Sequence, residues 1–253
     1  MHLPLKDSSR SIKRAIALLR VVAKSNLKGA RLSRLAKEAG LHAATAHRLL
    51  NVLAGEGFIT FNPTTKLYSL GIELYTLGHA AFQFQIRDRY HSALERIVEL
   101  TEDSVYLLIP NGYDSLCIDV VEGKTPIRIM SYNIGSRTPL GLGSGSLALL
   151  SILPEDQVEV ILAANERRYQ AHNGLLKEEI RAAVHAAREN GFSVSEGLFI
   201  KGVVGVGLPI CREEGKHAAL SVAAIADRMS PVRRIEIAQL VKREVALITG
   251  SPD

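Results

Sequence analysis

A run of glycines and serines, Gly-Leu-Gly-Ser-Gly-Ser at residues 141–146, lies directly before the apolar residues 147–152. The apolar residues predict a helix, so the run would lie at its N-terminus, where backbone N–H groups lack partners and the helix dipole is positive. Glycines let a ligand approach the backbone, and Ser144 and Ser146 add hydroxyl groups. The run therefore suits an anion such as a carboxylate. The alternative is that the glycines only turn the chain tightly.

Arrangements typical of catalysis or metal binding do not occur. The glycines at 141–145, 205 and 207 complete no G-x-G-x-x-G and no G-x-x-x-x-G-K-[ST] motif, and neither serine completes G-x-S-x-G. Cys117 and Cys211 are the only cysteines and stand alone, so they predict small buried residues. His42 and His47 would diverge on a helix and are a poor metal pair. We expect no enzyme activity, no metal and no cofactor.

A second set of polar side chains could read DNA. Thr45, His47 and Arg48 face outward from a predicted helix over 42–56, whose apolar residues 46, 49, 50 and 53 share the other face. The N-terminal residues of such a helix contact base edges in a major groove. We assign Thr45 and His47 to bases and Arg48 to a phosphate. The alternative for Arg48 is a salt bridge with Glu38 or Glu56.

The segments around this helix predict a winged helix-turn-helix. A short helix over 32–39 ends at Gly40, and a supporting helix over 12–23 precedes it. Strands over 58–61 and 66–70 enclose an Asn-Pro-Thr-Thr turn and form the wing, where Lys66 should meet the DNA backbone. The candidate DNA contacts are Arg31, Ser33, His42, Ala44, Thr45, His47, Arg48 and Lys66. Two core helices of a larger all-α protein are the alternative.

The charge distribution favours DNA binding by the N-terminal third. Residues 1–82 hold 12 basic and 4 acidic side chains, whereas the remaining residues hold 19 basic and 22 acidic ones. The net charge of +5 therefore comes entirely from the part that contains the predicted helix-turn-helix. A basic domain joined to a slightly acidic one indicates that only the first meets phosphates.

The rest of the chain predicts an α+β domain. A connecting helix over 71–84 carries an apolar stripe at Leu74, Leu77, Ala81 and Phe84, and a helix over 88–102 follows. An antiparallel meander, three helices, two paired strands and a last helix come next. Their predicted ranges are 104–109, 116–121, 127–132, 145–152, 155–165, 175–190, 203–210, 216–225 and 231–248.

Length and composition predict a cytoplasmic protein with no membrane segment. The chain has 253 residues, 47% of them hydrophobic, enough for two domains with proper cores. Its N-terminus is polar, and no stretch approaches the roughly 20 apolar residues that a membrane span requires.

Several motifs together resemble the IclR-type transcriptional regulators over nearly the whole chain. In the first part they are Gly40-Leu41 with Thr45, residues 47–50 (His-Arg-Leu-Leu), residues 57–59 (Gly-Phe-Ile) and residues 68–71 (Tyr-Ser-Leu-Gly). In the second part they are residues 135–140 (Gly-Ser-Arg-Thr-Pro-Leu), the glycine-rich run, Gly191-Phe192, Gly202 and Pro209.

The resemblance implies a winged helix-turn-helix at 8–70, a linker helix at 71–87 and a GAF-like antiparallel-sheet effector domain at 88–253. It also implies homodimers or dimers of dimers that bind an operator in double-stranded DNA and a small-molecule effector, in a family of which many members control catabolic operons. The implied effector-binding residues are Gly141, Leu142, Gly143, Ser144, Ser146, Ser195, Val204, Gly205, Val206, Ser221 and Ala223.

The chain departs from the family pattern around the ligand. At the start of the helix after Pro139 it has Gly145-Ser146, where many members have Gly-Lys. After the pair Gly191-Phe192, where many members have acidic residues, it has Ser195 followed by Glu196. Near the last strand it has Ala223 at a commonly polar position. Residues 198–208, opposite the glycine-rich run by resemblance, offer apolar side chains. One charged end and one apolar end predict an aromatic or otherwise apolar carboxylic acid as effector. An enzyme carried on a DNA-binding protein and an architectural DNA-binding protein without effector are the alternatives.

Overall fold

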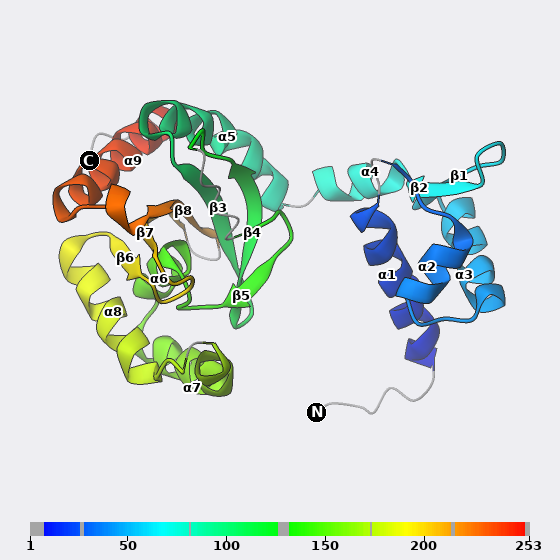
Figure 1. Cartoon of the computed structure of the whole chain (residues 1–253), viewed down its shortest axis with the longest axis horizontal. Coiled ribbons are helices and arrows are strands. Elements are labelled where there is room, and N and C mark those ends of the chain that lie inside the picture. The colour runs from blue at the N-terminus through cyan, green and yellow to red at the C-terminus, as the bar shows by residue number, and fades with distance from the viewer. Residues whose placement is uncertain are drawn as a thin grey trace. The chain divides into compact units, whose positions relative to one another are not determined.

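The computed structural model describes residues 8–25, 28–80, 82–125, 132–172, 174–213 and 216–250 (Figure 1). Contacts divide the chain into two compact units, residues 1–82 and 83–253. Separate clusters of buried apolar side chains lie in the two units. Each unit therefore has a hydrophobic core of its own.

The first unit is a winged helix-turn-helix. It contains α1 (Ser8–Lys24), α2 (Leu32–Glu38), α3 (Ala43–Gly55), β1 (Ile59–Asn62) and β2 (Leu67–Leu70). The apolar faces of the three helices meet at Leu18, Leu35 and Leu50, which are completely buried. Gly40, with φ 65°, lets the chain turn after α2, and the Leu41 N–H donates to the Ala36 carbonyl at 2.9 Å. The predicted elements of this unit are confirmed with small shifts at their ends.

The connection after the wing differs from the prediction. The expected helix over 71–84 is divided into α4 (Glu73–His79) and the start of α5 (Phe82–Thr101), which also contains the whole of the expected helix over 88–102 apart from its last residue. Apolar spacing continues through both helices and therefore gives no sign of the interruption after His79. Ala81 and the side chain of Phe84, two members of the expected stripe, lie outside the described residues.

The second unit is built on a six-stranded antiparallel sheet in the order β5-β4-β3-β8-β7-β6. One face packs on α5 and α9, and the other on α6, with α8 and α7 beyond it (Figure 1). The strands are β3 (Ser104–Asn111), β4 (Asp114–Val121), β5 (Arg137–Pro139), β6 (Ser193–Glu196), β7 (Val203–Glu213) and β8 (Lys216–Ile225). The helices are α6 (Ser144–Ser151), α7 (Glu155–Ala171), α8 (Lys177–Asn190) and α9 (Pro231–Thr249).

The α+β prediction is confirmed, with differences at the sheet edges. Strand β5, which was not predicted, pairs with β4 at one edge of the sheet. The expected strand over 127–132 lies outside the described residues except for Tyr132, which is not in a strand. Strand β6 was not expected, since its four residues include one apolar side chain. Helix α7 extends to Ala171, beyond the predicted end at 165.

Small residues form a seam on the face of the sheet that packs on α6. Three cross-strand pairs of β7 and β8 supply it: Gly205 with Ala223, Gly207 with Ser221 and Pro209 with Ala219. An added Cβ at Gly207 would overlap the Ser144 carbonyl group, and one at Gly205 would overlap the Ser144 hydroxyl. The seam therefore lets the first turn of α6 lie against the sheet at backbone distance.

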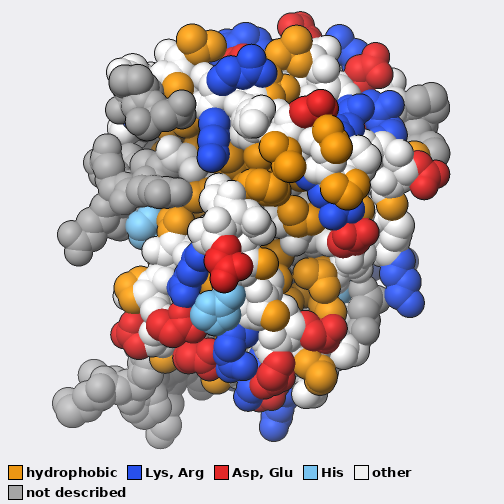
Figure 2. Space-filling model, turned by 90° about the vertical axis from the view of Figure 1, so that its left-hand side faces the viewer, with side chains coloured by type: hydrophobic (Ala, Val, Ile, Leu, Met, Phe, Trp, Pro, Cys, Tyr) orange, Lys and Arg blue, Asp and Glu red, His pale blue; other side chains and the backbone are white. Residues whose placement is uncertain are grey.

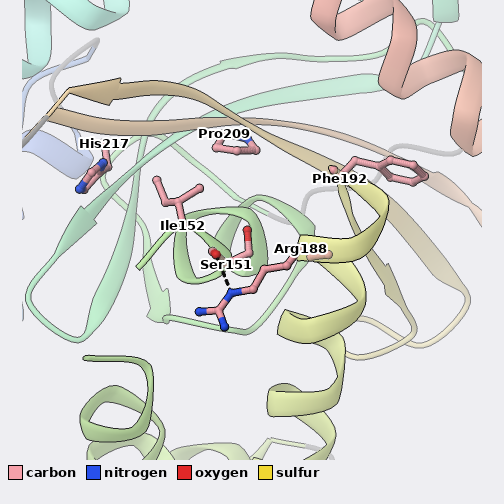
Figure 3. Close-up of a pocket in the computed structure, with 8 residues that line it drawn as sticks. Ser151, Ile152, Arg188, Phe192, Pro209 and His217 are labelled. Carbon is pink, nitrogen blue, oxygen red and sulfur yellow. Dashed lines mark hydrogen bonds between the residues drawn. The ribbon is translucent and has the colours of Figure 1, made fainter. Parts of the chain in front are cut away.

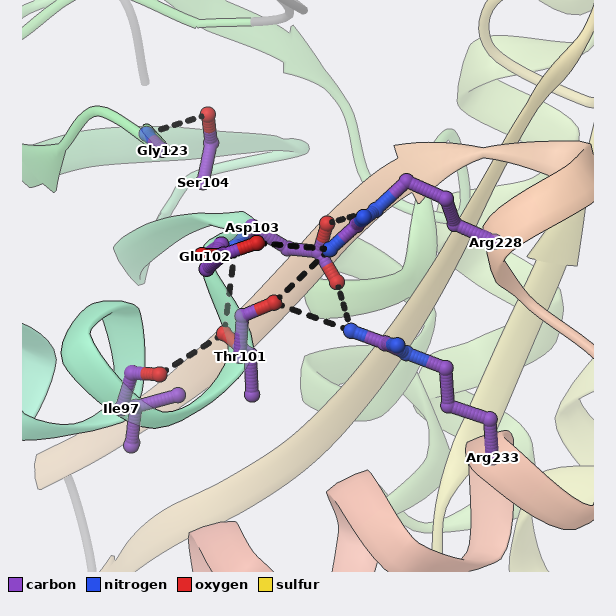
Figure 4. Close-up of polar contacts among 8 residues, drawn as sticks. All are labelled: Ile97, Thr101, Glu102, Asp103, Ser104, Gly123, Arg228 and Arg233. Atoms are coloured by element: carbon purple, nitrogen blue, oxygen red, sulfur yellow. Dashed lines mark hydrogen bonds and ion pairs between the residues drawn. The ribbon is translucent and has the colours of Figure 1, made fainter. Parts of the chain in front are cut away.

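A buried carboxylate joins the end of α5 to the C-terminal part of the unit (Figure 4). Asp103 is 2% exposed; its Oδ1 accepts a hydrogen bond from Arg228 Nε at 2.9 Å and its Oδ2 one from Arg233 Nη2 at 2.8 Å. Both arginines also donate to the Thr101 carbonyl, at 3.0 and 2.9 Å. These contacts tie α5, β3 and α9 together, and we call this group the Asp103 clamp.

Candidate DNA-binding surface and ligand cavity

Helix α3 presents the predicted base-reading residues on its outer face. His42, Ala44, His47 and Arg48 are exposed and Thr45 is half-buried, whereas Ala46 and Leu50 are buried beneath them. The first turn of α3 contains no acidic residue. This end of the helix is therefore free of charges that would repel phosphates.

The alternative role for Arg48, an intradomain salt bridge, finds no support among the described residues. Glu38 is engaged by Arg34, whose Nε lies 2.7 Å from Glu38 Oε1. In the described part of the chain no ion pair joins Arg48 to Glu38 or Glu56. The guanidinium of Arg48 is thus available to a ligand.

The wing and the start of α2 place three further predicted contacts at the surface. The Asn62 side chain accepts hydrogen bonds from the Thr64 and Thr65 N–H groups, at 2.9 and 3.0 Å, which shapes the turn. Lys66 follows with φ 58°, is exposed, and has its Nζ 6.0 Å from the centroid of the Phe61 ring. Arg31 and Ser33 are exposed at the start of α2.

A small cavity of about 20 Å³ lies between α6 and the sheet. It unites residues from four separate segments of the chain, and about half of the effector-binding residues that the sequence predicts line it. These are Gly143, Ser144, Ser195, Gly205, Ser221 and Ala223. The Ser144 and Ser221 hydroxyls lie 2.7 Å apart in a hydrogen bond within the cavity wall.

Three other predicted residues shape the approach to α6 without lining the cavity. The Ser146 hydroxyl accepts a hydrogen bond from the Gly141 N–H at 2.9 Å and donates to the Pro139 carbonyl at 3.2 Å. Leu142 is 1% exposed and packs in the core. Gly141 and Gly143 have φ values of 99° and 84°, which only glycine adopts without strain, so the turn before α6 depends on them.

Val204 and Val206 are not brought to the cavity. Side chains alternate along β7, and Val203 and Gly205 are on the cavity side. Val204 and Val206 are almost completely buried on the opposite face, toward α5 and α9. The sequence identified the right strand but did not separate its two faces, because both are apolar.

Aromatic side chains complete the cavity, and Tyr132 among them was not predicted. The rings of Tyr132 and Phe199 stack with centroids 5.0 Å apart and an interplanar angle of 14°. The Tyr132 hydroxyl donates to the Leu142 carbonyl at 3.1 Å, and burial raises the pKa of Tyr132, so it remains a donor at neutral pH. Its place just before the motif at 135–140 was the one available signal.

The cavity wall is uncharged. Its described residues carry hydroxyl, aromatic or aliphatic groups, and none is acidic or basic. Nearby, Cys117 is completely buried, which raises the pKa of its thiol to about 12 and keeps it protonated. Cys117 is therefore a core residue and not a nucleophile.

A larger hollow of about 300 Å³ lies where α6 and α8 end beside β7 and β8 (Figure 3). Its cationic group is already used, because Arg188 Nε donates to the Ser151 carbonyl at 2.9 Å and Nη2 to the Leu153 carbonyl at 2.8 Å, while Nη1 pairs with Glu155. Arg188 thus caps the C-terminal end of α6.

On the face shown in Figure 2, acidic and basic side chains are interspersed with hydrophobic ones. The described residues contain no group of three or more His, Cys, Asp or Glu side chains that could hold a metal ion. None of the described helices is both long and apolar enough to cross a membrane.

Comparison with known proteins identifies both units. Residues 11–63 match the IclR helix-turn-helix domain, and residues 78–249 match the family described as bacterial transcriptional regulator IclR C-terminal. The acetate operon repressor of Salmonella typhimurium is 27% identical over 255 residues, covering 98% of this chain and 92% of the relative. The regulator KipR of Bacillus subtilis is 25% identical over 243 residues, covering 94% and 95%.

Solved structures show the same fold. The IclR protein of Thermotoga maritima has a TM-score of 0.74 at 24% identity, covering 94% of this chain and 96% of that one. An IclR homologue from Microbacterium hydrocarbonoxydans, solved with 4-hydroxybenzoate, has a TM-score of 0.77 at 18% identity and covers 94% and 98%. The chain belongs to the IclR family and is a ligand-responsive, DNA-binding transcriptional regulator, not an enzyme.

Proposed function

We propose that this regulator responds to an aromatic or otherwise apolar carboxylic acid and controls a catabolic operon. Residues 8–70 would bind the operator, 71–87 would link the units and 88–253 would bind the effector. The observation that carries the proposal is the cavity beside α6, which is lined both by Ser144, Ser195 and Ser221 and by the aromatic residues Tyr132 and Phe199. The homologue that binds 4-hydroxybenzoate has the same fold, which is consistent with such a ligand.

The carboxylate would bind at the first turn of α6. Gly143 precedes this helix with φ 84°, and the backbone N–H groups of the first turn and the positive end of the helix dipole point toward the cavity end. The Ser144 and Ser221 hydroxyls, now bonded to each other, can each donate to an anion instead. The uncharged wall favours an apolar remainder of the ligand over a second polar group.

Aromatic acids are expected to stabilise the protein, and their methyl esters are not. A ligand that binds only the folded state adds about 2.7 kcal/mol at a concentration of 100 times its Kd. The measurement is a thermal shift with benzoate, 4-hydroxybenzoate and the matching esters, which keep the ring and remove the charge. Equal stabilisation by acid and ester would exclude the anion site, and binding of only sugars or polar oxoacids would exclude the apolar half.

The DNA-binding unit is proposed to act as a homodimer or a dimer of dimers. The short helix α4 exposes Tyr75 and Leu77 at 69% and 52%, and Ile72, directly before the helix, is 73% exposed. Exposed apolar side chains that follow one another on a short helix are typical of a protein interface. A dimer would select a pseudo-palindromic operator with half-sites about one helical turn, or a multiple of it, apart.

Arg48→Ala is expected to weaken binding to all DNA sequences alike, because Arg48 is proposed to contact a phosphate. The slope of log K against log salt should become less steep by about 0.9 for each lost contact. Thr45→Ala should instead change which sequence is preferred, by about 1–3 kcal/mol per base read. Fluorescence anisotropy on operator and random duplexes at several salt concentrations measures both. Arg243→Ala, an exposed arginine of α9, is the control, and an unchanged slope for Arg48→Ala would contradict its role.

A further inference from the structure

The Phe199 ring lies between two other rings at the mouth of the cavity. It stacks on Tyr132 at 5.0 Å and on His172 at 5.4 Å, with interplanar angles of 14° and 17°. The His172 Nε2 is 2.7 Å from the Phe199 carbonyl, which holds the backbone at the same place. Phe199 thus occupies a flat slot with an aromatic face on each side.

The space left beside this slot is too small for an aromatic ligand. The cavity measures about 20 Å³, whereas an apolar cavity of about 150 Å³ is known to bind benzene. A ring can enter only if part of the wall moves. At Gly205 and Gly207 the sheet lies so close to Ser144 of α6 that no side chain fits between them. The side of the cavity formed by β7 and α6 therefore cannot move to enlarge it.

The segment 197–202 is the part of the wall that can move. It contains no helix or strand and joins β6 to β7. It begins at Gly197 and ends at Gly202, both with positive φ and both with open space around them. Hydrogen bonds from the Gly197 N–H to the Val203 carbonyl and from the Ala226 N–H to the Gly202 carbonyl hold its base. The segment can therefore swing about its two glycines while its base stays in place, once the contact between His172 and the Phe199 carbonyl breaks.

We propose that Phe199 is a plug that determines ligand specificity: its ring fills the subsite for the ring of the effector, which displaces it and stacks on Tyr132 and His172 in its place. The proposal rests on the proposed function, because it names the subsite for the apolar half of the same acid. An aromatic ring replaces the two stacking contacts that Phe199 loses, whereas an aliphatic chain does not. A ligand can bind only the molecules in which the plug is displaced. The apparent affinity of every ligand is therefore its intrinsic affinity multiplied by the fraction of protein in this open state.

Phe199→Ala in the full chain is expected to bind benzoate at least tenfold more tightly than the unchanged protein. Calorimetry gives the affinities, and thermal shift with toluene, a ring without a carboxylate, reports the subsite alone. Toluene should raise the melting temperature of Phe199→Ala but not that of the wild-type protein. Phe199→Leu keeps the bulk and loses the stack, so its affinity for benzoate should lie between the two. Leu198→Ala, on the same segment and packed on the core outside the cavity lining, is the matched control and should change affinity less than twofold.

The outcomes separate this proposal from the proposed function. Unchanged or weaker benzoate binding by both Phe199 variants, with no response to toluene, makes Phe199 a fixed wall and overturns the plug. If the unchanged protein still prefers acids to esters, the proposed function stands without it. If toluene binds Phe199→Ala but acids and esters bind every variant equally, the plug stands and the carboxylate site fails.

Discussion

Gly207→Ala is expected to lower the stability of the second unit by more than about 3 kcal/mol, or to prevent its folding, because the added methyl group would overlap the Ser144 carbonyl. Overpacking typically costs about 1–3 kcal/mol when side chains can adjust. Here the obstacle is backbone on both sides, in α6 and β7, so little adjustment is available. For a unit of this size the transition midpoint should fall by roughly 6–12 °C or more.

Scanning calorimetry of the full chain measures this, with the two units followed as separate transitions. Gly112→Ala is the control, because Gly112 is a turn glycine in the same unit with φ 63° and nothing near its Cβ position. The stability of Gly112→Ala should fall only by the energy of placing alanine in a left-handed conformation, about 1–2 kcal/mol. Similar losses for the two variants would show that α6 does not depend on the seam of small residues.

Asp103→Ala is expected to destabilise the second unit by about 2–4 kcal/mol, because it leaves two arginines without their buried partner. The expected loss of stability is smaller than that for a fully buried ion pair, because the Arg228 and Arg233 side chains are 30% and 33% exposed and keep part of their hydration. The N–H of Asp103 and the Thr101 carbonyl retain their own contacts. The effect therefore reports mainly the carboxylate at the centre of the Asp103 clamp.

Chemical denaturation of the full chain, with a probe in the second unit, provides the measurement. Glu102→Gln is the matched control: Glu102 is a neighbouring acid that is 61% exposed and lies 3.8 Å from Arg228, so its loss should stay within about 1 kcal/mol. Arg233→Met added to Asp103→Ala should recover part of the stability by removing an unpaired charge. A double variant no more stable than Asp103→Ala would argue against uncompensated charge as the cause.

The sequence predicted the first unit almost completely, because its signals are local. Apolar spacing, Gly40 and the Asn62 turn are each readable within a few residues, and tertiary packing did not override them. The interruption of the helix after His79 was not predicted, because it has no local signal in the sequence. Apolar residues recur through α4 and α5, so periodicity alone predicts a continuous helix there.

The residues that line the cavity beside α6 were predicted in part, and the differences have two physical causes. Ser144, Ser195 and Ser221, which were predicted as polar residues in apolar segments, line the cavity. Val204 and Val206, also predicted, lie on the other face of a strand that is buried on both faces. Tyr132 stacks on Phe199, a contact across 67 positions of the chain, and its hydroxyl donates to the Leu142 carbonyl. Contacts of that range leave no periodic trace in the sequence.

The seam of small residues under α6 also limits how this regulator can acquire a new effector. Three cross-strand pairs of small residues bring the helix to the sheet at the distance of bare backbone, so any larger residue there displaces α6 itself. Random substitution of the seam residues would mostly yield variants that do not fold and few variants with altered ligand specificity. Directed evolution toward other effectors should therefore draw its useful changes from Tyr132, His172, Phe199, Ile200 and Val203, where variation alters the shape of the cavity without displacing α6.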